Sequence, residues 1–349
     1  MTRAFRVGLT RDFLKPDGSL GFGDIGLGLL GEHEGVEWEF LAEDTRELRA
    51  DQVGEYDALV VLAPVVSAAT LERADRLAVV ARFGVGYDTV DVEACTRNGV
   101  LLTITPDAVR RPVAVAALTF VLALSQEMLR KDRLTREGRW ADKLDLMGVG
   151  LIGRTLGVVG LGNIGSELCR LALPFGLRVV AADPYASAGH AREVGAELVG
   201  LETLLRTADF VCICCALAPE TRGLINADRL ALMKQSAFLI NVARGPIVDQ
   251  RALTEALRER RIRGAGLDVF EEEPVDPADP ILRLDNVIVT PHAICWTDEC
   301  FLDNGRSALG SVLDVAAGRV PKNVVNRDVI GTRQLEQKLR RFRARGGAR

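Results

Sequence analysis

Short apolar runs alternate with stretches of helical periodicity along the whole chain. In the first hundred residues these runs predict strands at 6–10, 36–41, 58–62, 79–83 and 100–104. Strands that alternate with helical stretches are typical of parallel sheets covered by helices. The first hundred residues therefore predict one small α/β unit.

Further apolar runs predict six more strands, at 155–160, 178–183, 210–215, 237–242, 264–270 and 286–290. Helical stretches lie between several of them; one has apolar residues at positions 252, 253, 256 and 257. Six strands in this alternation predict a complete doubly wound dinucleotide-binding sheet. The chain after Thr290 is too short for a domain, so we expect it to pack back on the first unit.

A long apolar stretch at 112–129 lies between the two groups of strands. It is apolar around most of its circumference and carries Pro112, which the pattern places in the first turn of a helix, where proline is tolerated. Such a helix must be buried, either between domains or between subunits.

Composition narrows the class of protein. The 349 residues are enough for two domains, and 48% hydrophobic with 26% charged residues is typical of a globular protein. A net charge of -4 gives no global attraction to nucleic acid or to an anionic membrane. No run of 18 apolar residues and no signal-peptide pattern occurs, so we expect a cytoplasmic protein without membrane partners.

The last residues and the cysteines modify this picture only slightly. Residues 331–349 contain seven Lys or Arg and one Glu, which predicts a solvated, partly frayed basic tail, with contact to a polyanion as the alternative. The seven cysteines lie mostly in apolar strands and helices, where they are expected to act as small hydrophobes without disulfides.

The sequence GLGNIG at 160–165 matches the dinucleotide-binding pattern GxGxxG in its full context. A predicted strand precedes it and a helical stretch follows it. Gly160 permits the tight turn, Gly162 lets the backbone approach a pyrophosphate, and Gly165 lets the helix pack on the strand. Asn163 and Ile164 complete the predicted cofactor-binding loop.

Asp183 ends the next predicted strand, 21 residues after Gly162. A carboxylate there accepts hydrogen bonds from both ribose hydroxyls and repels a 2'-phosphate, so the sequence favours NAD over NADP. A second match to the same pattern, GFGDIG at 21–26, has no strand before it, and we interpret it as a glycine-rich loop without a phosphate.

Three residues that can carry chemistry follow three predicted strands of the second group. Arg244, the glutamates at 271–273 and His292 come after the last three of these strands. Ligands of open parallel sheets bind beyond the carboxyl ends of the strands, so these residues converge on one edge. Each alone has an ordinary interpretation as a solvated arginine, a surface loop or a structural histidine.

Together the three side chains suit hydride transfer to a 2-keto acid or from a 2-hydroxy acid. Arginine binds a carboxylate through paired hydrogen bonds, and a positioned imidazole exchanges a proton with the carbonyl oxygen, typically accelerating the reaction by about 10² to 10⁴. A neighbouring carboxylate is expected to fix the histidine tautomer and to keep the imidazole protonated near neutral pH.

Several ordered motifs resemble those of the NAD-dependent D-isomer-specific 2-hydroxyacid dehydrogenases. They are RFGVGYDTVDV, TLGVVGLGNIG with its following strand, NVARGPIVD, GAGLDVFEEEP and NVIVTPHA, and the resemblance spans roughly residues 50–325. It implies that Arg244 binds and polarises the substrate, that His292 is the acid/base, and that Glu273 is the partner of His292. Spacing alone does not choose among the three glutamates.

The resemblance also implies a fold and further contacts. It implies two Rossmann-like domains: a doubly wound NAD-binding domain at 105–292, inserted in a smaller flavodoxin-like substrate domain at 1–104 and 293–330. An interdomain cleft and a homodimer built on the long helix are further expectations. The amides of Val85 and Gly86 are expected to hold the substrate carboxylate, and Asp268 to meet the nicotinamide carboxamide.

The chain departs from the family pattern at three places. Cys214 and Ala216 stand where members often have His and Pro. After His292 the chain carries larger residues than many members do, and Trp296 is a candidate wall of the substrate pocket. Arg110 and Arg111 replace small and acidic residues, which suggests a substrate with a second anionic group; an ordinary solvated or interface pair is the alternative.

Three other functions are weighed against this interpretation. A zinc site from His292, Cys295 and Cys300, with Cys212 or Cys214, lacks paired CxxC spacing, and we predict no metal. An NAD-sensing binding protein resembling the C-terminal binding proteins is the main alternative to an enzyme. A phosphite dehydrogenase uses the same three residue types and stays open, whereas the similar formate enzymes pair their histidine with glutamine.

Overall fold

The structure is a computed structural model that describes residues 3–346, and it divides into two compact units. Unit 1 comprises Met1–Val109 and Trp296–Arg349, and unit 2 comprises Arg110–Cys295. The expected divisions lay at 104 and 292, so residues 105–109 belong to unit 1 and residues 293–295 to unit 2.

Unit 1 contains a five-stranded parallel sheet in the order β2-β1-β3-β4-β5. This is the flavodoxin-like order. All five strands predicted in the first hundred residues are confirmed: β1 (Phe5–Leu9), β2 (Val36–Phe40), β3 (Ala58–Val61), β4 (Val79–Arg82) and β5 (Leu101–Thr103).

Helices cover both faces of this sheet because its central strands bury apolar side chains on both sides. One core cluster joins the strands to α1 (Gly28–Gly31), α11 (Asp298–Ala316) and α12 (Arg333–Gly346). The other joins them to α2 (Ala50–Val53), α3 (Val92–Arg97) and η2 (Thr70–Arg73). The short turns η1 (Arg11–Phe13) and η7 (Arg327–Val329) complete the unit.

The prediction of a solvated tail after residue 331 is wrong for the described part of that segment. Helix α12 buries Leu335, Leu339 and Phe342, and the Phe342 ring meets Phe5 edge to face. Lys338 is only 6% exposed, and its ammonium donates to three backbone carbonyls. The helical spacing of three apolar residues outweighs the basic composition, and 347–349 lie outside the described residues.

Unit 2 contains a seven-stranded parallel sheet in the order β12-β11-β10-β9-β6-β7-β8. The six predicted strands correspond to β6 (Thr155–Val159), β7 (Arg178–Ala182), β9 (Phe210–Ile213), β10 (Phe238–Asn241), β11 (Gly264–Leu267) and β12 (Val287–Val289). The additional strand β8 (Glu197–Leu198) has two residues, too few to give an apolar pattern.

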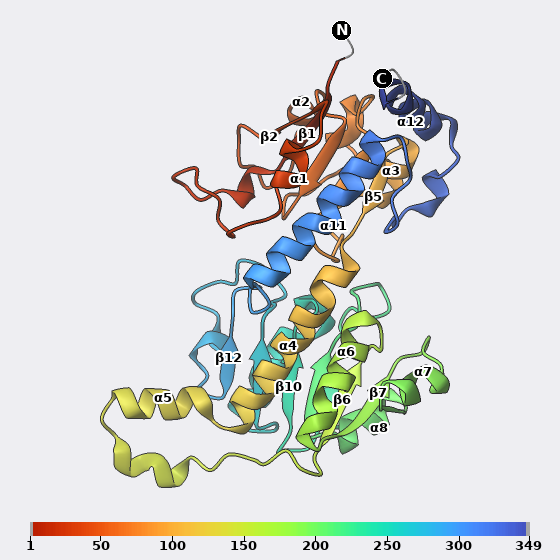
Figure 1. Ribbon diagram of the computed structural model, residues 1–349. Coiled ribbons are helices and arrows are strands. Elements are labelled where there is room, and N and C mark those ends of the chain that lie inside the picture. Colours follow the sequence, from red (N-terminus) through yellow and green to blue (C-terminus); the bar gives the residue numbers. More distant parts are fainter. Residues whose placement is uncertain (1–2, 347–349) are drawn as a thin grey trace. The chain divides into compact units, whose positions relative to one another are not determined.

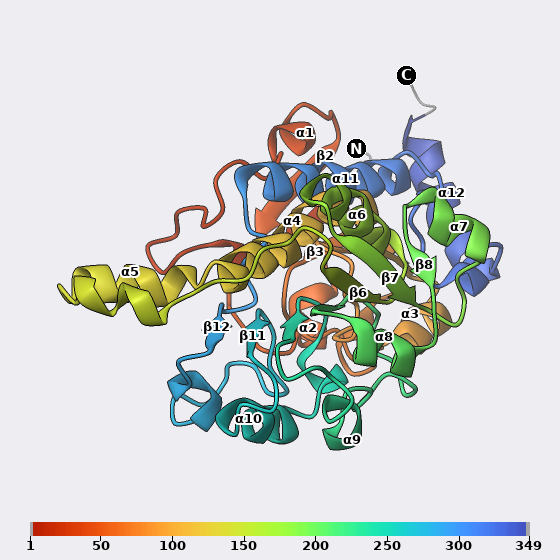
Figure 2. The ribbon, with the colours of Figure 1, turned by 90° about the horizontal axis from the view of Figure 1, so that it is seen from below.

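Helices lie on both faces of the unit 2 sheet, as Figures 1 and 2 show. One face is covered by α4 (Pro106–Ser125) and α6 (Asn163–Ala172), and the other by α8 (Leu201–Thr207), α9 (Ala227–Leu230) and α10 (Gln250–Arg258). The remaining elements are α5 (Met128–Arg136), α7 (Ala188–Glu193), η3 (Trp140–Asp145), η4 (Leu173–Phe175), η5 (Gly245–Ile247) and η6 (Pro280–Arg283).

The long helix differs from its prediction at both ends. It begins at Pro106, so Pro112 lies inside the helix and not in its first turn, and it ends at Ser125. Glu127 adopts a left-handed backbone with φ of 53°, which separates α4 from α5. Length and composition alone would let α4 cross a membrane, but its inner face, with Phe120 and Val121, is buried in the unit 2 core.

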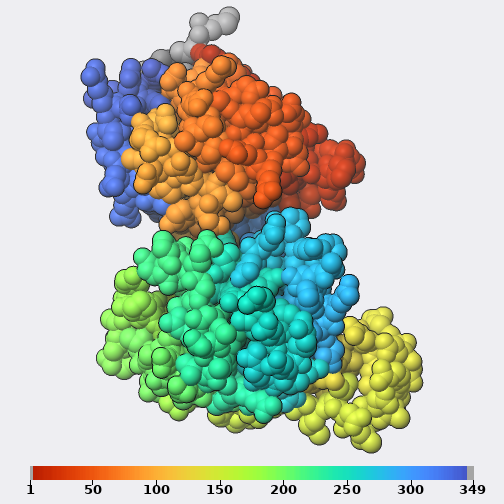
Figure 3. Space-filling view, turned by 180° about the vertical axis from the view of Figure 1, so that it is seen from behind, coloured from red at the N-terminus to blue at the C-terminus, as the bar shows by residue number. Residues whose placement is uncertain are grey.

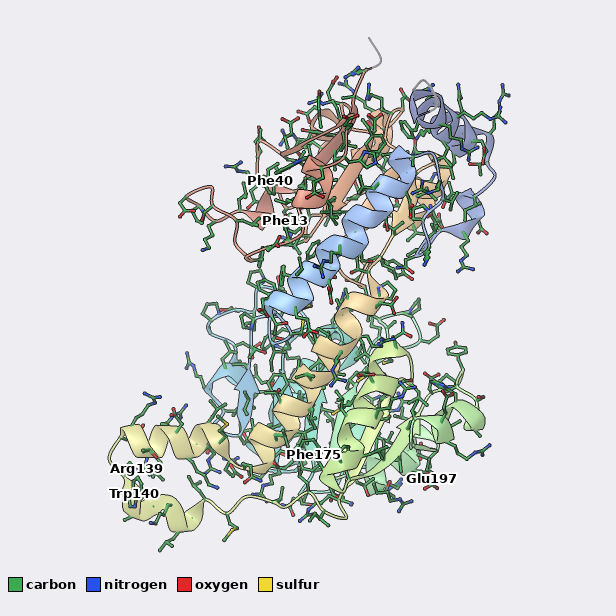
Figure 4. All side chains as sticks on the ribbon, viewed as in Figure 1. Phe13, Phe40, Arg139, Trp140, Phe175 and Glu197 are labelled. Atoms are coloured by element: carbon green, nitrogen blue, oxygen red, sulfur yellow. The ribbon has the colours of Figure 1, made fainter. Side chains whose placement is uncertain are left out.

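Helix α5 and turn η3 form an arm that projects from unit 2, drawn in yellow in Figures 1 and 3. Trp140, near the turn between them in Figure 4, is 64% exposed, and Leu144 and Met147 are 83% and 80% exposed. Such a concentration of exposed apolar side chains on one segment makes the arm a candidate interaction surface.

Candidate functional site

The three candidate catalytic residues follow three neighbouring strands of unit 2. Arg244 comes after β10, Glu273 after β11 and His292 after β12, and these strands are adjacent in the sheet. Parallel strands present their carboxyl ends at one edge, so the three loops share that edge.

The Arg244 and Glu273 loops approach each other more closely than a side chain would allow. Gly245 packs on the backbone between Phe270 and Glu271, and a Cβ added at Gly245 would overlap the carbonyl group of Phe270. The Arg244 guanidinium donates to the Ala243 carbonyl at 2.8 Å. Glycine after Arg244 is therefore required for the two loops to meet.

Glu273 is the glutamate that engages the histidine. His292 Nδ1 lies 2.7 Å from Glu273 Oε2, and the Phe270 N–H donates to Glu273 Oε1 at 3.0 Å. Burial by itself would raise the pKa of Glu273, but the hydrogen bond and charge of His292, the Phe270 amide and the Arg244 charge hold it below its ordinary value. Glu273 therefore stays ionised and faces the imidazole.

The turn that carries His292 is held by Asp268. His292 has a left-handed backbone, with φ of 54°, and its N–H donates to the Asp268 carbonyl at 2.8 Å. The Asp268 carboxylate, 3% exposed, accepts from the Thr290 hydroxyl and from the amides of Ala293 and Ile294 at 2.6, 2.9 and 3.1 Å. Asp268 thus shapes the His292 turn, in addition to the cofactor contact expected for it.

The other two glutamates are not part of this contact. Glu271 bonds to Gln250, whereas Glu272 has no hydrogen bond or ion pair with another described residue. Sequence reasoning missed Gln250, Gly245 and Thr290. In the sequence, only its position directly after Arg244 could have indicated a role for Gly245. Nothing in the sequence indicated a role for Gln250.

The glycine loop between β6 and α6 has room for a dinucleotide. Gly160 has φ of 93°, and a Cβ on Gly165 would overlap the Gly160 carbonyl, so both positions require glycine. Gly162 caps the N-terminus of α6 and has open space where its Cβ would be. The backbone therefore offers a pyrophosphate a helix N-terminus with open space at Gly162, which fits a bound dinucleotide. Asn163 and Ile164 are the first residues of α6.

Asp183 stands directly after β7 and borders the glycine loop. Its Oδ2 accepts from the Leu161 N–H at 2.7 Å, and its Oδ1 accepts from the Tyr185 N–H at 2.8 Å. The next residues, Pro184 and Tyr185, are exposed and bring no positive charge to this carboxylate. The site suits ribose hydroxyls better than a 2'-phosphate.

In unit 1 the predicted carboxylate-binding residues lie in a half-buried loop after β4. Among the described residues, neither the Val85 nor the Gly86 N–H donates to another group. The loop is tied at Gly84, whose carbonyl accepts from the Thr105 N–H at 3.0 Å, and the Thr105 hydroxyl bonds in turn to Asn304 of α11.

Trp296 belongs to an aromatic cluster of unit 1. Its ring centroid lies 5.0 Å from that of Phe22 and 5.3 Å from that of Phe301, both edge to face, and the indole is 48% exposed. The glycine-rich segment 21–26, which we interpreted as a loop without a phosphate, supplies Phe22 to this cluster. Trp296 thus presents a fixed apolar surface to solvent.

The structure shows the surroundings of two residues, Arg111 and Cys214, that depart from the family pattern. Arg111 forms an ion pair of 2.8 Å with Glu167 on α6, so its charge is already compensated within unit 2. Burial raises the pKa of the Cys214 thiol well above its ordinary value. Among residues 3–346, no group of three or more His, Cys, Asp or Glu side chains could hold a metal ion.

Comparisons with known proteins identify the family. Residues 118–293 match the family model described as D-isomer specific 2-hydroxyacid dehydrogenase, NAD binding domain. A glyoxylate reductase of Korarchaeum cryptofilum is 37% identical over 313 residues, which cover 88% of this chain and 94% of that protein. A D-3-phosphoglycerate dehydrogenase of Methanocaldococcus jannaschii is 39% identical, but the match covers only 54% of it.

Solved structures of similar proteins have the same fold as this chain. The TT0316 protein of Thermus thermophilus has a TM-score of 0.81 at 34% identity, covering 92% of this chain and 99% of that one. A D-lactate dehydrogenase of Aquifex aeolicus, solved with NAD and lactic acid, has a TM-score of 0.80 at 26% identity over the same shares of the two chains. The chain belongs to the NAD-dependent D-isomer-specific 2-hydroxyacid dehydrogenases.

Proposed function

We propose that this NAD-dependent D-2-hydroxyacid dehydrogenase interconverts a small 2-keto acid and the corresponding D-2-hydroxy acid, with Arg244, Glu273 and His292 as its catalytic residues. One observation carries the proposal: the hydrogen bond of 2.7 Å between His292 and Glu273 at the sheet edge where the Arg244 loop also ends. An ionised carboxylate, an imidazole and a guanidinium are the groups that this reaction requires.

We propose that one atom of the imidazole exchanges the proton. Since Nδ1 faces Glu273, the other ring nitrogen, Nε2, is the one that exchanges a proton with the substrate oxygen. In reduction Nε2 gives its proton to the carbonyl oxygen, and in oxidation it takes the proton of the hydroxyl. Glu273 fixes the tautomer and stabilises the positive charge of the protonated ring.

Arg244 binds the substrate carboxylate and polarises the neighbouring carbonyl. In unit 1 the amides of Val85 and Gly86 donate to no other described group, which leaves them available to a carboxylate. Bound at the glycine loop and at Asp183, NADH supplies the hydride. Asp183 gives the site its preference for NADH over NADPH by repelling a 2'-phosphate.

Two of these relatives are a glyoxylate reductase and a D-lactate dehydrogenase, so we propose substrates of that size. A larger substrate with a second anionic group is the alternative, because another relative is a D-3-phosphoglycerate dehydrogenase. Trp296, half exposed and fixed by its contact with Phe22, is our candidate for a side chain that selects among such substrates. The test is NADH oxidation by the purified protein with a panel of 2-keto acids that starts with glyoxylate and pyruvate, with NADPH in parallel. Reduction with NADH supports the proposal; binding of NADH without any turnover would favour an NAD-sensing protein.

We further propose a homodimer formed through α4 and the arm. Val115 on α4 is 44% exposed, and the arm exposes Trp140, Leu144 and Met147. Beside the arm, unit 2 has a cavity of about 830 Å³ lined by residues of α4, α5 and β12. Replacing Leu144 by Asp is expected to yield monomers in light scattering; an unchanged mass would count against this interface.

We also propose that the protein is located in the cytoplasm. All seven cysteines are free thiols, most of them buried, and such a set is compatible with a reducing compartment.

A further inference from the structure

The segment that carries Arg244 touches the segment that carries Glu273 twice. The first contact is Gly245 against Phe270. The second lies at the start of α10, where Gln250 and Glu271 form a reciprocal pair of hydrogen bonds: the Gln250 N–H donates to Glu271 Oε1 at 3.1 Å, and the Glu271 N–H donates to Gln250 Oε1 at 3.0 Å. We call this pair the Gln250–Glu271 clasp.

Gln250 is itself held on two sides. Its Nε2 donates to Asp279 Oδ2 at 2.7 Å, so the amide has a fixed orientation. Helix α10, which Gln250 begins, is anchored in the unit 2 core by Leu253 and Leu257, 1% and 0% exposed. The clasp therefore connects a rigid helix to an otherwise exposed loop.

The loop in question places the carboxylate that meets the histidine. Glu271 directly follows Phe270, whose N–H donates to Glu273 Oε1. The turn at 270–273 thus has Gly245 and Gln250 on one side and the Glu273 carboxylate at its end. A loop of three successive glutamates repels itself, so it needs such external bonds to keep one geometry.

We propose that Gln250 is a positioning residue for catalysis: through Glu271 it holds the turn that aims Glu273 at His292. This proposal rests on the proposed function for its effect on turnover, although the clasp itself does not. It gives Glu271 a role that the sequence pattern left open, and it distinguishes the three glutamates: Glu273 orients the imidazole, Glu271 orients Glu273, and Glu272 does neither.

The test uses Gln250→Met, which removes the amide but keeps the side-chain length. Glu272→Gln is the matched control on the same turn. We expect Gln250→Met to lower kcat about tenfold, a part of the 10²-fold that a displacement of 1 Å can cost, without changing NADH affinity. Glu272→Gln is expected to keep the parent kcat.

A second readout does not depend on turnover. The titration of the Glu273 carboxyl carbon, followed by NMR and assigned with Glu273→Gln, reports the contact with His292 directly. Charges facing this carboxylate are those of His292 and Arg244. Opening the clasp loosens the contact and is expected to raise the pKa of Glu273. If no keto acid is reduced by the parent protein, the proposed function fails, yet this titration still decides the clasp.

Gln250→Glu replaces Gln250→Met in this test if the Met variant does not fold. It keeps the size and start of α10 but sets a carboxylate against Glu271 and Asp279, and is expected to act in the same direction. A parent-like kcat and a parent-like Glu273 titration in either folded variant would overturn the proposal. An equal loss in Glu272→Gln would also overturn it, because the effect would then belong to the charge of the turn.

Discussion

Gly245 packs against Phe270 so closely that the smallest side chain would overlap the Phe270 carbonyl. This contact joins the loop after β10, which carries Arg244, to the loop after β11, which carries Glu273. The glycine therefore sets the separation of Arg244, the proposed substrate-binding cation, from Glu273, whose carboxylate bonds to the His292 imidazole.

The Gly245→Ala variant should separate these two loops. We expect kcat with the best keto acid to fall by about 10²-fold, since a displacement of about 1 Å is enough for such a loss. The measurement is steady-state kinetics combined with NADH binding, which should stay unchanged. Gly200→Ala, at a position with open space, is the control and should behave like the parent.

The Asp268 carboxylate gives a second test of positioning. Thr290→Val removes one of its three donors, and because Asp268 is buried we expect a loss of about 1 kcal/mol in stability together with a lower kcat. Thr290→Ser keeps the hydroxyl and should restore both properties. Urea unfolding and kinetics on the two variants would show the difference; equal behaviour would mean that the hydroxyl does not hold the His292 turn.

The pH dependence of turnover follows from Glu273. Its pKa lies below the ordinary 4.5, so the carboxylate that pairs with His292 persists to lower pH than a free glutamate would. The stabilising contact is fully present above the unfolded-state pKa and is lost as the pH falls through the lower folded-state value. For keto-acid reduction, in which His292 acts in its protonated form, the acidic limb of kcat/KM should therefore lie below pH 4.5 in protein that stays folded. A limb above that value in this direction would contradict the assignment.

The buried Lys338 leads us to predict how the stability of the protein depends on pH. Burial lowers its pKa from 10.5 to about 8, so the folded protein releases this proton at a lower pH than the unfolded chain does. Stability should therefore rise with pH between 8 and 10.5 relative to Lys338→Met, by an amount on the order of 3 kcal/mol. Urea unfolding at several pH values measures this slope, and Lys15→Met, at an exposed position, should leave the slope unchanged.

Much of the fold could be predicted from the sequence because its strands are apolar and several residues long. Strand β8 escaped because two residues carry no periodicity, and the start of α4 was misplaced because Pro112 looked like a helix beginning. Helix α12 was misread because its charge count hid the spacing of Leu335, Leu339 and Phe342.

Part of the candidate site could also be predicted from the sequence, because some of its residues directly follow apolar strands. The sequence itself shows that Arg244 and His292 come directly after predicted strands, and it also shows the glycine loop. The contacts that position them are not: Gln250 lies 21 residues from Glu271, and only folding brings α10 beside that turn. The choice of Glu273 among three glutamates needed the family resemblance at first and has a direct contact in the structure.

The most direct test of the central claim is turnover by His292→Ala with NADH and the best keto acid of the panel. Loss of a positioned acid or base is expected to lower kcat by about 10² to 10⁴. NADH affinity should stay unchanged, because the glycine loop and Asp183 follow other strands of the sheet. A variant that binds NADH normally and has almost no turnover is the predicted result; parent-like turnover would contradict the assignment of His292 as the proton carrier.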